Sequence, residues 1–494
     1  MKEKKNNEAI YIKQLLEALK NKYNTIPLPA KASFWFMVSS VFQKAVGLFV
    51  IPLYTRLMLP EEYGKYAVFL SYYSIISVFT SLGLYNYVVN NGIIKFGEKK
   101  DAFVTSLAGL IIVNTFIYVL LYLIFADQWF EFTRINTGIM IALFIECIFM
   151  PCYELWCCKL RFSYNYKPII KTAVITCLMI PAISLPLIIL SDDKGAAAIW
   201  GRVIGYSVIG FCALIRLIKS DDTLFKKSYW RYALKFNLPL LPHFLAVILL
   251  NSADKIIIER LCGLDKAGIY SLAFSLSLAF QFVNQAINSS LVPYIYLKLK
   301  NNIFDGIKEK TTKLLIGIEI LNILLMLIAP ELILILGTEK YLEACYIIPS
   351  VAIVNILLFI FNLFVNVEYF YEENKYIPVV TVFCAAFNII VNYIAIPKFG
   401  YLVAGYITLF TYLFYAIGHY LLMKRACYKH RINIKQIYDM TIIVKTIIGS
   451  ITISFIILFT YNYLIIRYLL MFIIVIYFVL NKKVYYCNGN TNKN

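Results

Sequence analysis

Apolar runs of about 20 residues recur along the whole chain, and short segments rich in lysine and arginine separate them. An α-helix needs about 20 apolar residues to cross the hydrocarbon core of a bilayer. The runs are continuous, as in Leu469 to Leu480, whereas barrel strands would alternate between apolar and polar residues. Because every backbone polar group within lipid must bond internally, this pattern predicts an all-α integral membrane protein.

Fourteen runs are long enough to be membrane-spanning helices. The junction between the ninth and tenth runs is the least regular, because Pro330 and Gly337 interrupt an apolar stretch there. The predicted spans are 32–54, 66–88, 104–126, 137–158, 169–190, 196–217, 236–258, 269–291, 312–330, 344–366, 376–397, 401–422, 441–460 and 463–480.

The positive charge of the chain follows the order of these spans. Lysine and arginine outnumber aspartate and glutamate by 47 to 28, which gives a formal charge of +19. With the N-terminus in the cytoplasm, about 33 basic residues fall in cytoplasmic segments and about 9 in external loops, as the positive-inside rule requires. Most of the charge would then lie beside anionic membrane lipids, and no nucleic-acid partner is expected. Both termini are predicted to be cytoplasmic.

The remaining segments contain no feature of an enzyme or a metalloprotein. Residues 1–31 are polar and basic without a signal-peptide core, which predicts a cytoplasmic tail. Within it, Ala9 to Leu19 would form either a short amphipathic surface helix or part of a frayed tail. The eleven cysteines show no metal or redox spacing, so no cofactor is expected. Loops of at most about 25 residues leave no room for a soluble catalytic domain.

An internal repeat relates the two halves of the chain. A shift of 204 residues carries Arg56-Leu57 and Gly64-Lys65-Tyr66 onto Arg260-Leu261 and Gly268-Ile269-Tyr270 without a gap. Because six helices return the chain to its starting side, two six-helix lobes would share one orientation in the membrane. Parallel repeats of this kind are typical of transporters that rock one lobe against the other.

Three groups of segments carry a family resemblance, and they span about residues 30–425. The first is Lys44 to Tyr66; the second is Leu238 to His243, Ser252 to Ile258 and Gly268 to Tyr270; the third is Ile377-Pro378, Asn388 to Asn392, Ile396 to Gly400 and Ala404-Gly405. In order and spacing they resemble the Wzx-type polysaccharide flippases of the multidrug/oligosaccharidyl-lipid/polysaccharide (MOP) exporter superfamily. One departure is Val403-Ala404-Gly405, where Gly-Ala-Ala is common.

The resemblance implies a fold, a cargo and a location. Lobes of residues 32–220 and 221–425 would surround a central cavity, and residues 426–494 would form two further helices and a cytoplasmic tail. The cargo would be an undecaprenyl-pyrophosphate-linked oligosaccharide for O-antigen, capsule or exopolysaccharide synthesis, flipped across a bacterial cytoplasmic membrane by alternating access. A polysaccharide polymerase machinery would be a further partner.

Cations within or at the ends of the spans are candidate ligands of the pyrophosphate. Arginine offers paired planar donors to phosphate oxygens and lysine a point charge. The expected head-group ligands are Lys44, Arg56, Arg202, Lys255 and Arg260. Because ionised groups within lipid are costly, four of these cations have a structural role as their alternative, and Lys255 would contact either another helix or the cavity. These roles are ion pairing of Lys44 with Glu146 or Glu154, snorkelling of Arg202, and interfacial anchoring of Arg56 and Arg260.

Amide side chains are candidates for the path of the glycan, because amides suit sugar hydroxyls. The eighth and tenth spans carry them at helical spacing: Gln281, Asn284, Gln285, Asn288, Asn355 and Asn362. Hydrogen bonding between helices is an equally good role for these amides.

Three acidic residues in the spans, Glu146, Glu154 and Asp254, are candidates for coupling transport to H⁺ or Na⁺, with structural ion pairing as the alternative. Two other functions remain as rivals. A multidrug-type antiporter on the same scaffold would favour cavity carboxylates over cations. A membrane polysaccharide polymerase would need a longer external loop than this sequence has.

Overall fold

The computed structural model describes residues 25–373 and 375–480, and it contains no β-strand within these ranges. Residues 1–24, which include the candidate helix from Ala9 to Leu19, and residues 481–494 lie outside the described part of the chain. The short helices are α4 (Val88–Phe96), η1 (Gly97–Lys99), α6 (Ala126–Thr133), α10 (Lys227–Asn237), η2 (Leu238–Leu240), α14 (Ala329–Leu336), η3 (Glu339–Ile347) and α18 (Ile434–Ile437).

Fourteen helices in the described ranges are 17 or more residues long, and each one coincides with a predicted span. They are α2 (Leu28–Leu57), α3 (Pro60–Ser81), α5 (Lys100–Ile124), α7 (Thr137–Phe162), α8 (Tyr166–Leu190), α9 (Lys194–Ser220), α11 (Leu241–Cys262), α12 (Leu264–Lys300), α13 (Ile307–Leu327), α15 (Ile348–Phe370), α16 (Ile377–Phe399), α17 (Val403–Lys429), α19 (Met440–Thr460) and α20 (Leu464–Leu480). The predicted all-α membrane fold is confirmed.

Hydropathy supports ten or eleven of the fourteen predicted spans, and the main helix break lies where the sequence predicts one. Ten helical segments of the described chain are long and apolar enough to cross a membrane. The pair α13 and α14 would form an eleventh span that bends by 68°. The bend lies where Pro330 enters the first turn of α14, because proline cannot continue the hydrogen-bond ladder of α13. The predicted irregularity after the ninth span is therefore confirmed.

Helix α3 begins six residues before the predicted second span and also ends earlier. Proline at its first position already has a helical φ, and the Glu62 carboxylate accepts a hydrogen bond from the backbone N–H of Leu59 at 2.7 Å. These two contacts fix the start of the helix outside the apolar run. Leu82, in the left-handed region with a φ of 52°, ends it.

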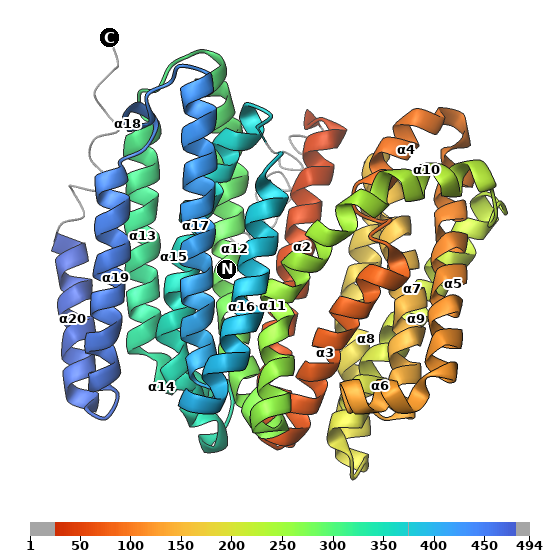
Figure 1. Cartoon of the computed structure of the whole chain (residues 1–494), viewed down its shortest axis with the longest axis horizontal. Helices are drawn as coiled ribbons and strands as arrows, with labels where there is room; N and C mark the ends of the chain where they lie inside the picture. Colours follow the sequence, from red (N-terminus) through yellow and green to blue (C-terminus); the bar gives the residue numbers. More distant parts are fainter. Residues whose placement is uncertain (1–24, 374, 481–494) are drawn as a thin grey trace, which may run out of the picture.

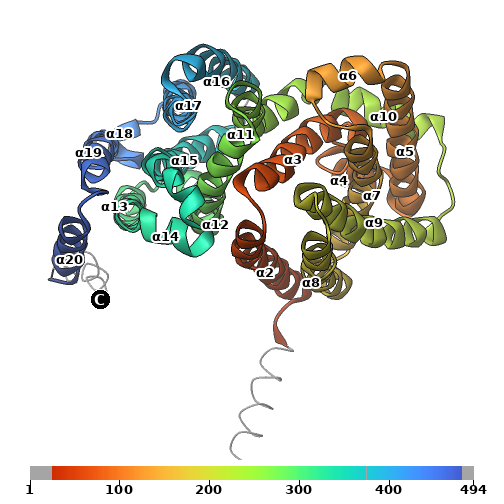
Figure 2. The ribbon, with the colours of Figure 1, turned by 90° about the horizontal axis from the view of Figure 1, so that it is seen from below.

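The long helices form two bundles with a separate pair at one side (Figures 1 and 2). Helices α2 to α9 form the first bundle and α11 to α17 the second, while α19 and α20 lie outside the second bundle beside α13. The linking helix α10 packs on the first bundle, where the Trp230 indole donates to the carbonyl oxygen of Ser106 at 2.9 Å. We call the top of Figure 1, with α4, α10 and α18, the upper end, and the bottom, with α6 and α14, the lower end.

Small residues let neighbouring helices approach closely in the first bundle. A Cβ atom at Gly201 on α9 would lie 2.4 Å from the Cβ of Ser184 on α8, and one at Gly210 would lie 2.2 Å from the carbonyl oxygen of Phe149 on α7. Helix α9 is thereby held against both neighbours, and this close packing places its charged residue Arg202 beside α7.

Candidate functional site

A largely buried ion pair joins α7 and α9 within the first bundle. The Arg202 guanidinium on α9 donates from Nε and Nη2 to Oε1 of Glu146 on α7, at 3.1 and 2.8 Å. The Glu146 side chain is fully buried, and its Oε2 makes no hydrogen bond with the described residues. The structure therefore joins two residues for which the sequence predicted separate roles, a head-group cation and an ion-coupling acid.

The same guanidinium lines a hollow of about 190 Å³ between α2, α3, α8 and α9. The central carbon of the guanidinium lies 4.5 Å from the ring centre of Tyr206 and 5.9 Å from that of Tyr73. The hollow is lined by Gln43, Val46, Gly47, Val50, Ile51, Tyr54, Tyr63, Tyr66, Thr176, Cys177, Ile180, Pro181, Arg202 and Tyr206. Arginine has five N–H donors and Glu146 receives two, so the remaining donors can serve a further anion.

Lys44 links the two bundles rather than pairing with an acid of its own bundle. Its Nζ on α2 donates to Oε1 of Gln285 on α12 at 3.3 Å. A predicted head-group cation and a predicted glycan-path amide are thus brought together where the bundles face each other. The predicted alternative, an ion pair with Glu146 or Glu154, is not formed in this conformation: Glu146 binds Arg202, and the Glu154 carboxylate lies 3.8 Å from Arg161.

A second polar cluster surrounds Asp254 in the second bundle. The buried carboxylate on α11 accepts hydrogen bonds from the Tyr270 hydroxyl and the Thr408 hydroxyl, both at 2.7 Å, and from the Asn392 amide at 2.9 Å. The Asn388 amide donates to the Thr408 hydroxyl at 3.4 Å. The side-chain oxygens of Asn388 and Asn392 are buried and accept no hydrogen bond from the described residues.

Asp254 is a predicted candidate for ion coupling, whereas no role was predicted for the residues that surround it. Asn388 and Asn392 lie in a segment that carries the family resemblance, and their spacing by one helical turn places both on the same face of α16. That spacing could have identified the two asparagines as a polar pair. Thr408 on α17 could not be predicted, because its place beside Asp254 depends on how α11, α16 and α17 pack. Lys255, next in sequence, points elsewhere, with Nζ 5.3 Å from the ring centre of Phe274.

The amide residues of α12 and α15 mainly hold these two helices together. The Asn284 amide donates to the carbonyl oxygen of Asn355 at 2.7 Å, and the Asn366 amide donates to Oδ1 of Asn288 at 2.8 Å. Gln285 is exposed and accepts from Lys44, while Gln281 and Asn362 are half-buried. Asn284 and Asn288 thus make the interhelical bonds that were the alternative to a glycan path.

Arg56 and Arg260 lie at the lower end, each beside the opposite bundle. Nη2 of Arg56, at the end of α2, donates to the carbonyl oxygen of Ile335 in α14 at 3.4 Å. Nη2 of Arg260, at the end of α11, donates to the carbonyl oxygens of Glu131 and Phe132 in α6 at 2.9 and 2.5 Å. In this conformation backbone carbonyls therefore occupy both guanidinium groups.

The sequence did not indicate the pair formed by Glu368 and His419. Nδ1 of His419 on α17 lies 3.0 and 3.2 Å from the two carboxylate oxygens of Glu368 on α15, and both side chains are fully buried. The rings of Phe361 and Tyr415 stand edge-on to the imidazole, with centres 4.7 Å away. Fifty-one residues separate the two partners, so no local pattern could reveal them.

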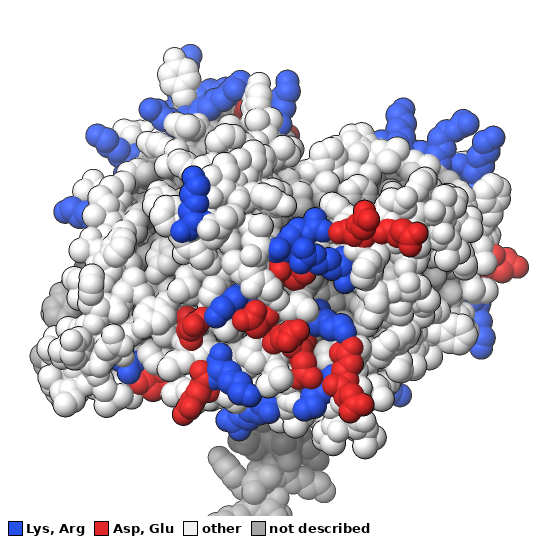
Figure 3. Space-filling view, turned by 60° about the horizontal axis from the view of Figure 1, so that its bottom comes forward, with Lys and Arg blue, Asp and Glu red and all other residues white. Residues whose placement is uncertain are grey.

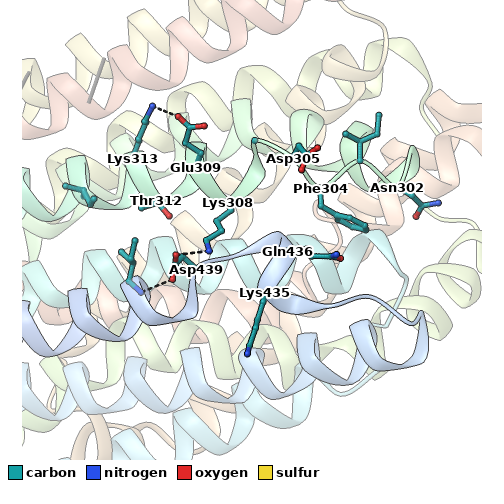
Figure 4. Close-up of a pocket in the computed structure, with 14 residues that line it drawn as sticks. Asn302, Phe304, Asp305, Lys308, Glu309, Thr312, Lys313, Lys435, Gln436 and Asp439 are labelled. Carbon is teal, nitrogen blue, oxygen red and sulfur yellow. Dashed lines mark hydrogen bonds and ion pairs between the residues drawn. The ribbon is translucent and has the colours of Figure 1, made fainter. Parts of the chain in front are cut away.

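A separate hollow of about 770 Å³ lies on the surface at the upper end, between the α12–α13 link and α18–α19 (Figure 4). Two of its lysines pair with acids of the same surface: Lys308 Nζ lies 3.0 Å from Asp439 Oδ2, and Lys313 Nζ lies 2.6 Å from Glu309 Oε1. The hydrogen bond from Lys308 lowers the pKa of Asp439. Because the hollow lies beside α19 and away from the junction of the bundles, it does not belong to a path between them.

The match to a known family covers most of the helices just described. A family model described as "Polysaccharide biosynthesis protein" matches residues 30–296, more than half of the chain and nearly all of α2 to α12. The chain belongs to this family. The sequence also resembles the "Lsg locus putative protein 1" of Haemophilus influenzae, with 24% identity over 70% of this chain and 86% of the relative.

Solved structures identify the fold of this member of the family. The lipid II flippase MurJ, in an inward closed conformation, superposes with a TM-score of 0.69 at 14% identity and covers 91% of this chain and 99% of its own. An inward-facing multidrug resistance MATE family transporter of the MOP superfamily gives a TM-score of 0.55 at 11% identity, over 79% and 96% of the two chains. These likenesses establish the fold, which is the one that the resemblance in the sequence predicted.

Proposed function

We propose that this protein flips an undecaprenyl-pyrophosphate-linked oligosaccharide from the cytoplasmic to the outer leaflet of a bacterial cytoplasmic membrane by alternating access. Its family supports a role in polysaccharide biosynthesis. The fold supports transport, because two bundles with the proposed boundaries at residues 32–220 and 221–425 can move against each other. The polymer could be an O-antigen, a capsule or an exopolysaccharide, and membrane lipids and a polymerase machinery are the proposed partners.

The position of the Arg202 guanidinium is the observation that most strongly supports the proposal. A guanidinium lies deep in an apolar bundle and lines a hollow with tyrosines and an amide, as a site for a phosphate and a sugar requires. Its partner Glu146 balances the charge of the guanidinium but receives only two of its five N–H donors, so donors remain for phosphate oxygens. Lys44, which donates to Gln285 across the junction of the two bundles, and Lys255 are proposed to supply further positive charge outside this hollow. A multidrug-type site for cationic drugs would need a free carboxylate here, and Glu146 is already paired.

Surface charge supports an orientation with the upper end in the cytoplasm. Figure 3 shows Asp and Glu intermixed with Lys and Arg on the lower face, whereas Lys and Arg predominate along the upper rim of the same view. Positive loops are retained on the cytoplasmic side. We therefore propose that the upper end, from which α2 begins and at which α20 ends, is cytoplasmic and that the lower end is the outer end.

The Asp254 cluster is our candidate for ion coupling. The Asp254 carboxylate lies where α11, α16 and α17 meet, and the nearby amides of Asn388 and Asn392 have buried oxygens that accept no hydrogen bond from the described residues. Oxygen ligands of this kind suit a hard cation such as Na⁺, and a proton could neutralise the carboxylate instead. Asp254→Asn should make flipping insensitive to the collapse of the coupling gradient. If the rate in the unmodified protein does not respond to either gradient, the coupling proposal is wrong.

A series of charge-removing variants in proteoliposomes tests the central proposal. The cargo is a fluorescent undecaprenyl-pyrophosphate glycan, and loss of its accessible label from the donor leaflet measures flipping. Arg202→Gln should reduce the rate by about 10²-fold or more, since a charge-assisted contact to the pyrophosphate is lost. Arg216→Ala on the same helix, whose guanidinium stacks on Trp156 at 4.9 Å, is the control and should keep the rate.

The double variant Arg202→Gln with Glu146→Gln separates a cargo contact from a structural one. Two amides can replace the buried ion pair by a neutral hydrogen bond, so the double variant should regain the stability lost in the single variant. Its flipping rate should stay low, because the cation is still missing. Recovery of flipping in the double variant would show that Arg202 serves only the stability of the bundle, and the proposed site would be wrong.

A further inference from the structure

The repeat of 204 residues that is visible in the sequence also relates the contacts between the two bundles at the lower end. Arg56 and Arg260 are equivalent under this shift, and so are their acceptors, the carbonyls of Glu131 and Ile335. The short helices that hold these carbonyls, α6 and α14, correspond within one residue. Each bundle therefore offers one arginine to the other and receives one in return.

The residues before the arginines repeat the same exchange. The Thr55 hydroxyl donates to the carbonyl oxygen of Leu336 at the end of α14, at 2.5 Å. Its equivalent, Glu259, lies with Oε1 3.8 Å from Nη1 of Arg134, the residue that directly follows α6. Two successive side chains at the ends of α2 and α11 thus contact the last turn of the short helix in the opposite bundle.

A pair of glycines brings the bundles together at the same level. A Cβ atom at Gly64 on α3 would lie 1.9 Å from the carbonyl oxygen of Leu264 on α12. A Cβ atom at its equivalent Gly268 would lie 2.0 Å from the carbonyl oxygen of Pro60 on α3. Pro60 and Leu264 are themselves equivalent under the shift. The lower ends of α3 and α12 thus cross around a pseudo-twofold axis with backbones in contact.

The arginine contacts are of a favourable electrostatic type. The last carbonyls of an α-helix have no partner within the helix and carry the negative end of its dipole. A guanidinium that donates to them satisfies these acceptors and adds a charge-assisted hydrogen bond. A lysine at the same place has a single ammonium and cannot reach two carbonyls in the same plane as well. Both contacts exist only while the lower ends of the bundles touch.

We propose that Arg56 and Arg260 are two equivalent latches that hold the lower end of the protein closed, each by binding the last carbonyls of the short helix in the opposite bundle. The inference rests on the proposed alternating access and adds how one of its gates is held. Opening toward the outer side requires both guanidinium groups to leave their carbonyls, and the pseudo-symmetry gives the two latches the same direction of effect.

Spin-label distances test the latches without any cargo. Glu61 and Asp265 are exposed, lie on either side of the lower junction and are equivalent under the repeat. Both are changed to cysteine and labelled in a background in which the three cysteines that are not buried in the described residues, Cys177, Cys212 and Cys262, and also Cys487 are replaced by alanine. Arg56→Ala and Arg260→Ala should each raise the ratio of long to short distances about tenfold, as expected for the loss of a charge-assisted hydrogen bond. The double variant should raise it further.

Three comparisons decide the outcome. Lys266→Ala removes a cation from the same end that pairs with Glu343 of its own bundle, at 2.9 Å, and should leave the distances unchanged. Arg56→Lys and Arg260→Lys, which keep the charge, should give intermediate ratios and guard against unfolding of the alanine variants. Unchanged distances in both arginine variants, or a change in only one of them, would overturn the proposal.

The readout is independent of the cargo. If the latch variants open but the unmodified protein does not flip the lipid-linked glycan, the proposed function is refuted and the latches stand. If the unmodified protein flips the glycan but the distances in the latch variants are unchanged, the latches are refuted and the proposed function stands.

Discussion

Gly64→Ala is the substitution whose effect on the lower gate can be worked out most directly. The new Cβ atom would lie 1.9 Å from the Leu264 carbonyl oxygen, and real Cβ atoms essentially never approach a heavy atom closer than 3.0 Å, so α3 and α12 must separate by about 1.1 Å. The nearest atoms all belong to the backbone of α12, so no flexible side chain can move aside to relieve the clash. Overpacking of this kind costs about 1–3 kcal/mol.

Only the closed conformation suffers this clash. Alanine also favours a helix over glycine by about 1 kcal/mol, but it does so in the closed and the open conformation alike. The difference of about 1–3 kcal/mol between the conformations should therefore lower the closed-to-open ratio by about 5- to 150-fold. Gly268→Ala should act in the same direction, since its Cβ atom would meet the Pro60 carbonyl oxygen at 2.0 Å.

The distance between labels at Glu61 and Asp265 measures this shift in a purified protein. Gly317→Ala on α13 is the matched control, because a Cβ atom there would meet no heavy atom within 4 Å. It carries the same gain in helix propensity without the clash. If Gly64→Ala leaves the distance distribution as Gly317→Ala does, the close crossing of α3 and α12 does not hold the gate, and the reasoning from the repeat fails.

Three further predictions concern buried pairs and a surface carboxylate. Glu146→Ala should lower the free energy of unfolding by about 3–5 kcal/mol, because the Arg202 guanidinium loses its buried partner; a thermal melt in detergent checks this, and a change below about 1 kcal/mol would contradict it. Glu368→Ala should destabilise the protein similarly through His419, and Glu368→Gln, which keeps one hydrogen bond, should cost less. The lowered pKa of Asp439 means that its contribution is present above the ordinary aspartate pKa and lost as the pH falls through the lowered value; melts at pH 7 and pH 3 should differ less in Asp439→Asn than in the unmodified protein.

Part of the site could be predicted from single residues, because a charge within an apolar run must have a partner or a purpose. Arg202, Glu146 and Asp254 were found in this way, and the structure shows each of them with polar partners. Their partnerships could not be predicted. Arg202 and Glu146 are separated by 56 residues, and several helices could have brought either residue a different neighbour. Glu368 and His419 were missed altogether, since neither lies in a motif that stands out.

The sequence by itself determined the number and order of the long helices, the bend at Pro330 and the repeat, because the length of apolar runs, the geometry of proline and self-similarity are properties of local sequence. It also placed Arg56 and Arg260 at equivalent positions. Only the tertiary structure decided what these arginines bind. Their acceptors are backbone carbonyls of the opposite bundle, and every residue has such a carbonyl, so its availability depends on where a helix ends and which bundle lies beside it.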